Sequence, residues 1–207
     1  MNLLILASQS PRRRDLLTKA GFKFQILSIE ISENLNENLS LDAALMDLAR
    51  RKARALVESG KLPNSGEFVI LSADTVVILE GEIINKPFDA IDAHAILGRL
   101  SGKTHSVKTA VSLMKVEVEG EKNNKIHGKP KILSGVETSY VTFSTLTKTQ
   151  IEDYVRDKKP FDKAGAYGVQ DVPSDFLKEF RGPVDNVMGL PVTLVKQLIE
   201  KSGWDVD

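Results

Sequence analysis

Four cations and two carboxylates are the residues of this sequence whose types and positions suggest chemistry. They are Arg12, Arg13, Lys52, Lys86, Glu33 and Asp74. A triphosphate carries about four negative charges, which must be neutralised by fixed cations or a divalent ion. Several cations together with a carboxylate that can hold a metal therefore indicate a polyphosphate site.

Asp74 is the strongest anomaly in the sequence. It lies beside Thr75 inside residues 68–79, a segment that is otherwise apolar and is predicted to form a strand. Burying an ionised carboxylate without a partner costs at least several kcal/mol. We therefore expect Asp74 to meet a metal, a cation or water. The alternative is a bulge or strand end at which the acid binds nearby amides.

Lys52 lies on the apolar stripe of a helix predicted to begin after Ser40. It follows Leu48 by four residues and precedes Leu56 by four, so its ammonium should point toward the packed side, unlike that of Arg54. A lysine at the edge of the stripe, with its charge reaching solvent, is the alternative. The inward cation is the interpretation we favour.

The first seventeen residues are predicted to form a strand, a loop and a helix. Residues 3–7 are apolar, Ser10 can cap the helix, and Pro11 suits its first position. Three arginines follow at the positive end of the helix dipole, where each costs ~0.3–1 kcal/mol and a bound phosphate would offset that cost. A solvated basic face explains this turn equally well.

The rest of the chain alternates predicted strands and helices. We expect three further helices. The first begins at Asp89 and stops at Gly102, the second follows a capping box formed by Thr147 and Gln150, and the third runs from Pro191 to Gly203. Further elements are a strand over residues 22–29, a loop around Glu33, paired antiparallel strands over residues 105–118 and 134–146, and a short helix near residues 176–180.

Two segments are irregular. Residues 119–131 are polar and are predicted to form a long hairpin tip or loop without chemistry of its own. In residues 161–170, Gly165 and Gly168 allow the backbone to approach a flat ligand closely, while Lys163 and Gln170 offer polar contacts. A glycine-containing turn without a ligand is the simpler interpretation of that second segment.

Composition excludes several classes of function. The 207 residues fit one domain, or one domain with two lobes. The 28 basic residues balance 28 acidic ones, so no overall field attracts nucleic acid or a membrane. Without cysteine there is no thiolate nucleophile and no zinc-thiolate site. No phosphate-loop, dinucleotide or zinc-protease motif occurs, and the three histidines lack metal-ligand spacing. With no signal peptide or membrane span, we expect a cytoplasmic protein.

Six motifs in sequence resemble those of the Maf family of nucleoside triphosphate pyrophosphatases. They are LASQSPRRRDLL, the lysine of LARRKA, SADTVV, INKP, DKAGAYGVQ and NVMGLP, from Leu3 to about Leu198. The resemblance implies one Maf-like domain over residues 1–207, with residues 119–131 as a polar hairpin insertion. It also implies an elongated, two-lobed α/β fold, a mixed sheet flanked by helices, similar to inosine triphosphate pyrophosphatase. The nucleotide would bind in a cleft between the lobes.

The resemblance also implies an activity and a set of site residues. The family splits a nucleoside triphosphate into the monophosphate and pyrophosphate with a divalent metal, Mg or Mn. Asp74 resembles the proton acceptor for the attacking water, and Glu33 with Asp74 resembles the metal-binding acids. The positions that line the triphosphate are matched by Ser8, Arg12, Arg13, Lys52 and Lys86.

Within the family, the chain resembles the branch that prefers dTTP and UTP, and less the branch acting on 7-methyl-GTP. The specificity positions are matched by Arg12, Thr75 and Gln170. A glutamine amide can pair with both O4 and N3–H of uracil or thymine. Two departures are Asn85, which replaces the glycine usual before Lys86, and the length of residues 119–131.

The expected partners are a nucleoside triphosphate and a second copy of the chain, with no nucleic acid and no membrane. The family name refers to an effect on septum formation. One alternative function is therefore a regulatory nucleotide-binding protein of cell division that performs no turnover. A nucleotidyltransferase is another. A buried carboxylate beside a polyphosphate argues against simple binding, since it repels the ligand unless a metal intervenes.

Overall fold

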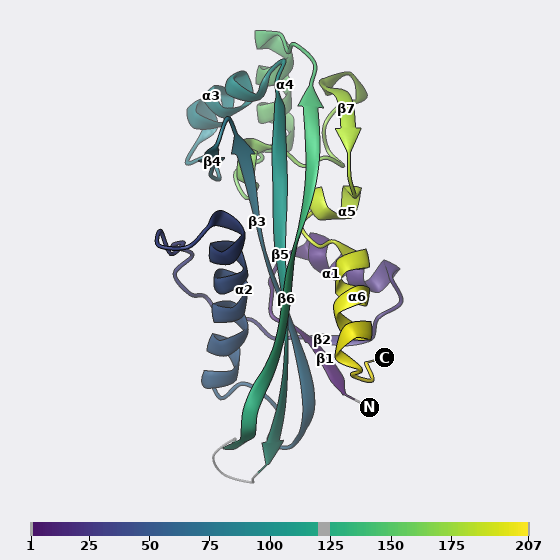
Figure 1. The fold of residues 1–207 in the computed structure, drawn as a ribbon. Helices are drawn as coiled ribbons and strands as arrows, with labels where there is room; N and C mark the ends of the chain where they lie inside the picture. Colours follow the sequence, from purple (N-terminus) through teal and green to yellow (C-terminus); the bar gives the residue numbers. More distant parts are fainter. Residues whose placement is uncertain (1, 120–124, 207) are drawn as a thin grey trace. The chain divides into compact units, whose positions relative to one another are not determined.

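The computed structural model describes residues 2–119 and 125–206. It contains a seven-stranded sheet with the order β2-β1-β3-β5-β6-β7, and β4 pairs with β3 (Figure 1). The strands are β1 Leu3–Leu6, β2 Phe24–Ile26, β3 Gly66–Leu79, β4 Glu82–Ile84, β5 Thr104–Glu119, β6 Lys125–Phe143 and β7 Leu177–Arg181. The helices are α1 Pro11–Lys19, α2 Leu41–Glu58, α3 Ala90–Leu100, α4 Lys148–Lys158, α5 Val184–Val187 and α6 Val192–Ser202, with short 3₁₀ turns η1 Ala164–Ala166 and η2 Ser174–Phe176. The predicted α/β class, a mixed sheet with helices, is confirmed.

The chain divides into two compact units. The first comprises Met1–Asp74, Thr109–Glu137 and Gly189–Asp207, and the second comprises Thr75–Lys108 and Thr138–Met188. Strands β3, β5 and β6 each contribute residues to both units. That the two form a single domain stays a prediction.

The first unit begins with the predicted strand, loop and helix. Strand β1 pairs in parallel with both β2 and β3, and the β1–β2 connection carries α1. Helix α2 lies on one face of these strands, and α6 lies on the other (Figure 1). Buried side chains of α2, β3 and β5, among them Leu56, Ile70 and Met114, form the core of this unit. This packing fixes the α2 face that carries Lys52.

The second unit is built around an aromatic cluster. Strand β4 pairs antiparallel with the end of β3, and β7 pairs antiparallel with the end of β6. The Phe143 ring lies edge-on to Tyr167 and His105, with centroids 5.0 and 5.1 Å apart, and Phe176 lies 6.3 Å away. Helices α3 and α4 supply apolar side chains to the same core, and η1 packs into it through Ala166. The glycine-containing segment therefore rests on a rigid base.

Most predicted helix ends are confirmed. Ser10 caps α1 with Pro11 at its start, Thr147 and Gln150 form the capping box of α4, and Gly203 ends α6 in the left-handed conformation. Asp89 caps α3 by accepting from the Asp92 amide at 2.9 Å. These ends depend on local residues, which explains why the sequence alone predicts them.

Two predictions for irregular segments are wrong. Residues 177–181 are strand β7 and not a helix, because pairing with β6 outweighs their local preference. In the predicted loop over residues 119–131, Glu119 still belongs to β5 and β6 begins at Lys125, with Ile126 partly buried against the core of the first unit. Residues 120–124 of that segment lie outside the described residues.

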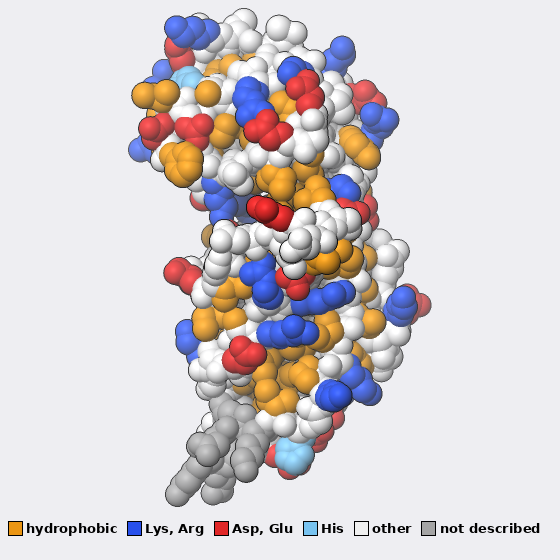
Figure 2. Space-filling view, turned by 60° about the vertical axis from the view of Figure 1, so that its left-hand side comes forward, with side chains coloured by type: hydrophobic (Ala, Val, Ile, Leu, Met, Phe, Trp, Pro, Cys, Tyr) orange, Lys and Arg blue, Asp and Glu red, His pale blue; other side chains and the backbone are white. Residues whose placement is uncertain are grey.

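The described surface has mixed charge. Figure 2 shows acidic, basic and hydrophobic side chains interspersed on the face that it presents, as expected for balanced charge. Among the described helices, none combines the length and the apolar character that crossing a bilayer requires.

Candidate active site

The start of α1 gathers hydroxyl and guanidinium groups. Ser8 Oγ accepts from the Ser10 amide and from Arg13 Nη1, both at 3.2 Å. Arg13 Nε donates to the Gly189 carbonyl at 2.8 Å, which ties α1 to the turn before α6. Ser8 and Arg13 are thus held at a helix N-terminus, where the positive end of the helix dipole stabilises an anion.

Arg13 is electrostatically coupled to the predicted acids. Removal from water lowers the pKa of Arg13 below its ordinary value, the charge of Asp74 acts in the opposite direction, and neighbouring Arg12 lowers it further. Glu33 also favours the charged form. An arginine stays protonated in proteins, so the important result is proximity: Arg12, Glu33 and Asp74 all lie within electrostatic range of Arg13.

Lys52 joins the two acids directly. Lys52 Nζ donates to Glu33 Oε1 and to Asp74 Oδ1, each at 2.6 Å. The Lys52 and Asp74 side chains are 13% exposed and the Glu33 side chain is 55% exposed. The predicted inward direction of Lys52 is therefore confirmed, and Asp74 has the cationic partner that its burial requires.

Arg51 was missed by the sequence analysis. Its guanidinium donates to the Ser32 carbonyl at 3.0 Å, to the Asn34 carbonyl at 2.6 Å and to Asp47 Oδ2 at 3.0 Å. The two carbonyls flank Glu33, so Arg51 fixes the loop that carries this acid. Only its place next to Lys52 could have drawn attention to Arg51, because the loop it holds is distant in sequence.

The other predicted residues belong to the second unit. Thr75 is half-buried in β3, Lys86 is exposed after β4, and Gln170 is exposed in the turn after η1. The Gly165 amide donates to the Asn85 carbonyl at 3.2 Å, which joins the segment of Lys86 to that of Gln170. The structure thus brings Ser8, Arg12, Arg13, Glu33, Lys52 and Asp74 together in the first unit, and it places Thr75, Lys86 and Gln170 in the second.

A buried histidine supports the turn that carries Gln170. His105 Nε2 and Tyr167 Oη are 2.7 Å apart, and His105 is 1% exposed. Burial lowers the pKa of His105 to about 4, and burial raises the pKa of Tyr167, so both groups are neutral at neutral pH. The pair is structural and fixes the backbone just before Gly168.

The acids can hold a divalent ion only with help from other ligands. Within residues 2–119 and 125–206, no group of three or more His, Cys, Asp or Glu side chains is placed to bind a metal. Magnesium, however, usually takes one or two carboxylates and completes its shell with water and substrate phosphates. Glu33 and Asp74 surround one ammonium, so their oxygens already face a cation, and this donor set fits such a shared ion.

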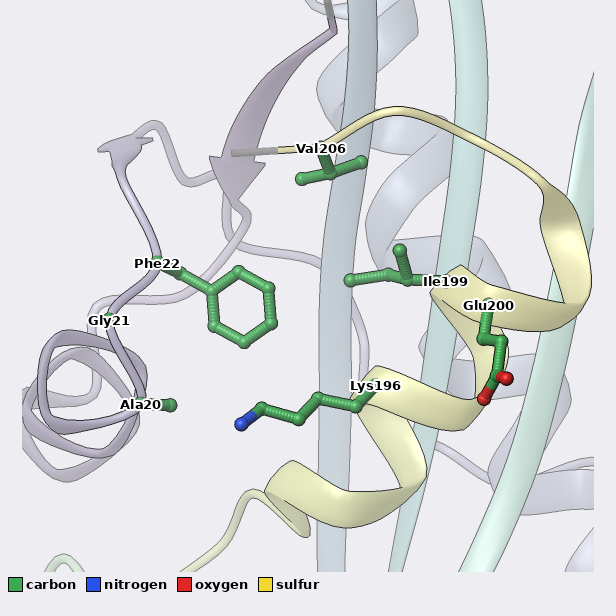
Figure 3. Close-up of a pocket in the computed structure, with 7 residues that line it drawn as sticks. All are labelled: Ala20, Gly21, Phe22, Lys196, Ile199, Glu200 and Val206. Atoms are coloured by element: carbon green, nitrogen blue, oxygen red, sulfur yellow. The ribbon is translucent and has the colours of Figure 1, made fainter.

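A surface hollow in the first unit does not coincide with these residues. It is lined by Ala20, Gly21, Phe22, Lys196, Ile199, Glu200 and Val206. Figure 3 shows Phe22 and Ile199 facing each other across it, with Lys196 directed toward the end of α1. None of the predicted site residues lines it, and its mostly apolar walls do not suit a polyphosphate.

The arginines at the N-terminus of α1 place positive charge where a helix already favours an anion. A family model described as Maf-like protein matches residues 3–202. The chain belongs to the Maf family.

Curated relatives agree along the whole chain. A protein of Bdellovibrio bacteriovorus named dTTP/UTP pyrophosphatase is 43% identical over 198 residues, which cover 96% of this chain and 97% of that protein. A protein of Bacillus thuringiensis with the same name is 38% identical over 206 residues, covering 100% and 98%.

Solved structures are only distantly similar. A dITP/XTP pyrophosphatase from Mycobacterium abscessus is 16% identical with a TM-score of 0.32, covering 67% of this chain and 72% of that one. The Staphylococcus aureus Ham1 protein is 12% identical with a TM-score of 0.35, covering 68% and 72%.

Proposed function

We propose that this protein hydrolyses dTTP and UTP between the α and β phosphates, which gives the monophosphate and pyrophosphate. The observation that carries the proposal is the Lys52 ammonium held between Glu33 and Asp74 beside two arginines. The names of the relatives in Bdellovibrio and Bacillus support the substrates.

In the proposed reaction, Asp74 accepts a proton from the attacking water. In the structure, Asp74 Oδ1 accepts from Lys52, and Oδ2 is the oxygen that we assign to receive the proton. The water oxygen forms a bond to the α phosphorus, the bond to the bridging oxygen breaks, and pyrophosphate departs with the electron pair. Arg12, Arg13 and Lys86 neutralise the charge on the phosphates, while the Ser8 hydroxyl donates to their oxygens and the positive end of the α1 dipole stabilises them.

We propose that Glu33 and Asp74 hold a divalent cation, Mg or Mn, together with substrate phosphates. When bound, such an ion neutralises phosphate charge and makes the phosphorus more susceptible to attack. Support comes from the two carboxylates that converge on one cation in the structure. We further propose that Gln170 pairs with O4 and N3–H of the pyrimidine, with Arg12 and Thr75 contributing to specificity.

The activity is tested by measuring pyrophosphate release from dTTP, UTP, CTP, 7-methyl-GTP and dITP with magnesium or manganese. Release from dTTP and UTP, with the monophosphate identified as the second product, is the expected result. Preference for 7-methyl-GTP would assign the chain to the other branch. Nucleotide binding without release from any of the five would favour a regulatory protein.

The role of Asp74 is tested by Asp74→Asn, which keeps the shape of the side chain but not its basicity. Turnover should fall by about 10²–10⁴-fold, as for loss of a general base, while nucleotide still binds. Asp15→Asn removes an exposed acid of α1 and should leave turnover unchanged. Near wild-type turnover of a folded Asp74→Asn protein would remove Asp74 from the mechanism.

We propose that the protein acts as a cytoplasmic homodimer, a view supported by its resemblance to the family and by the balanced charge of the chain. Light scattering coupled to size-exclusion chromatography tests the dimer, and a monomer at micromolar concentration would contradict it. A role in septum formation stays a prediction from the family name.

A further inference from the structure

The side-chain amide of Gln170 is held by the next residue. Gln170 Nε2 donates to Asp171 Oδ2 at 3.0 Å, and in the described part of the chain this is the one hydrogen bond of the Gln170 side chain. A carboxylate can only accept, so the amide must present its NH₂ group to Asp171 and not its carbonyl. The contact therefore determines which way round the amide lies.

The backbone beneath this contact is fixed. The Gly168 amide donates to Tyr154 Oη at 3.2 Å, and the Asp171 amide donates back to the Gly168 carbonyl at 2.8 Å. A Cβ at residue 168 would lie 2.6 Å from Asp171 Oδ2 and 2.8 Å from Gln170 Nε2. Glycine at this position leaves room for the two side chains to meet, so the orientation of the amide is supported by a rigid turn.

Orientation matters because pyrimidines differ in the direction of their hydrogen bonds. Uracil and thymine offer an acceptor at O4 and a donor at N3, whereas cytosine offers a donor at N4 and an acceptor at N3. An amide that can rotate by 180° can pair with uracil or thymine in one orientation and with cytosine in the other. An amide of fixed orientation makes both hydrogen bonds with only one of these two kinds of base. A device that fixes the amide therefore discriminates between the two kinds of base.

We propose that Asp171 is a specificity-determining positioning residue, which holds the Gln170 amide in the orientation that pairs with uracil or thymine and rejects cytosine. This inference rests on the proposed function, in which Gln170 contacts the base. Asp171 touches no substrate in this account and acts only through its neighbour.

The test is Asp171→Asn, a substitution of nearly the same shape. An asparagine amide can donate or accept, so it can hold Gln170 in either orientation. We expect kcat/KM for CTP to rise by about three- to tenfold, and that for UTP to fall by no more than about twofold, as for one net hydrogen bond. Both changes should appear in KM and not in kcat, because the base is bound equally before and during the reaction.

A matched control exists in the same unit. Asp175 Oδ2 accepts from Gln150 Nε2 at 2.7 Å, so Asp175→Asn alters the same kind of contact without touching Gln170. This variant should keep the wild-type preference for UTP over CTP. If Asp175→Asn changes the preference for UTP over CTP as Asp171→Asn does, the change reflects a general loss of structure. That result would contradict the inference.

Binding measurements separate this inference from the proposed activity. Dissociation constants of the non-hydrolysable α,β-methylene analogues of UTP and CTP should show the same change of preference in Asp171→Asn. Failure of the wild type to turn over UTP, with the analogue preference intact, would overturn the activity and support the inference. A wild type that binds or hydrolyses CTP as well as UTP, or an unchanged ratio in Asp171→Asn, would overturn the inference alone. A protein that binds neither analogue would overturn both.

Discussion

Lys52 supplies the ammonium group that pairs with Asp74, a buried acid of the first unit. Replacing it by methionine keeps much of its volume but leaves Asp74, only 9% exposed, and Glu33 without the ammonium. We expect Lys52→Met to lower the free energy of unfolding by about 1–3 kcal/mol, the usual cost of leaving a buried polar group without its partner.

The measurement is urea unfolding at neutral pH. Lys115→Met is the control, since Lys115 also contacts an acid, Glu67 Oε2 at 2.8 Å, but the glutamate side chain is 45% exposed. Because solvent screens an ion pair of that kind, its loss should cost less stability than the loss of Lys52. Equal losses in the two variants would mean that burial of Asp74 is not what makes Lys52 important.

His105 should make stability depend on pH. Its pKa is about 4 in the folded protein because of burial, against an ordinary value of 6.5, so the unfolded chain takes up the proton first as pH falls. Its contribution is complete above pH 6.5 and is lost as pH decreases toward 4, with a slope of up to about 1.4 kcal/mol per pH unit.

Urea unfolding of the wild type and of His105→Gln between pH 7 and pH 4 measures this effect. The stability difference between the two proteins should shrink as pH falls, because glutamine does not titrate. His94→Gln, at a half-buried position on α3, is the control and should follow the wild type. Parallel curves for wild type and His105→Gln would show that the pKa of His105 is the same in the folded and the unfolded protein, and would contradict this prediction.

At the scale of elements, Arg51 on α2 determines the position of the loop that carries Glu33. A lysine cannot reproduce the fork that reaches the Ser32 and Asn34 carbonyls together with Asp47. If Glu33 helps to hold the metal, Arg51→Lys should raise the metal concentration for half-maximal pyrophosphate release by about tenfold, as for other residues that orient a ligand.

The matched control is Arg54→Lys, at an exposed position of the same helix. It should leave the metal titration unchanged. An Arg51→Lys protein with the wild-type metal dependence would show either that Glu33 is not a metal ligand or that its loop keeps its place without Arg51.

How far the elements are predictable depends on whether their determinants are local. Two helix starts are predictable because side chains of Ser10, Thr147 and Gln150 cap them. The spacing of apolar residues around Lys52 likewise predicts that its side chain points inward. Strand β7 was missed because it forms only against β6, which is distant in sequence. Asp74 and Glu33 were each recognised as unusual, but only the folded chain shows that one ammonium joins them.

At the scale of the molecule, the two units should unfold together. The boundary between the units falls inside β3, β5 and β6, so neither unit can lose its strands without disturbing segments that continue into the other. We expect one cooperative transition in urea.

The chain supplies a separate probe for each unit. Trp204 belongs to the first unit, whereas Tyr140, Tyr154 and Tyr167 all belong to the second. Tryptophan fluorescence excited at the red edge and tyrosine near-ultraviolet circular dichroism should give the same midpoint. Two separate midpoints would show that each unit folds independently.

The ammonium between the two acids also bears on the sequence of binding events. A divalent ion arriving alone would have to displace a cation that Glu33 and Asp74 already neutralise, and it would gain few ligands in return. An ion that arrives on a triphosphate brings phosphate oxygens with it, and those oxygens offer the displaced lysine a new partner. Under the proposed mechanism, Lys52 thus acts as a built-in counterion that keeps the resting enzyme from capturing metal before the nucleotide is present.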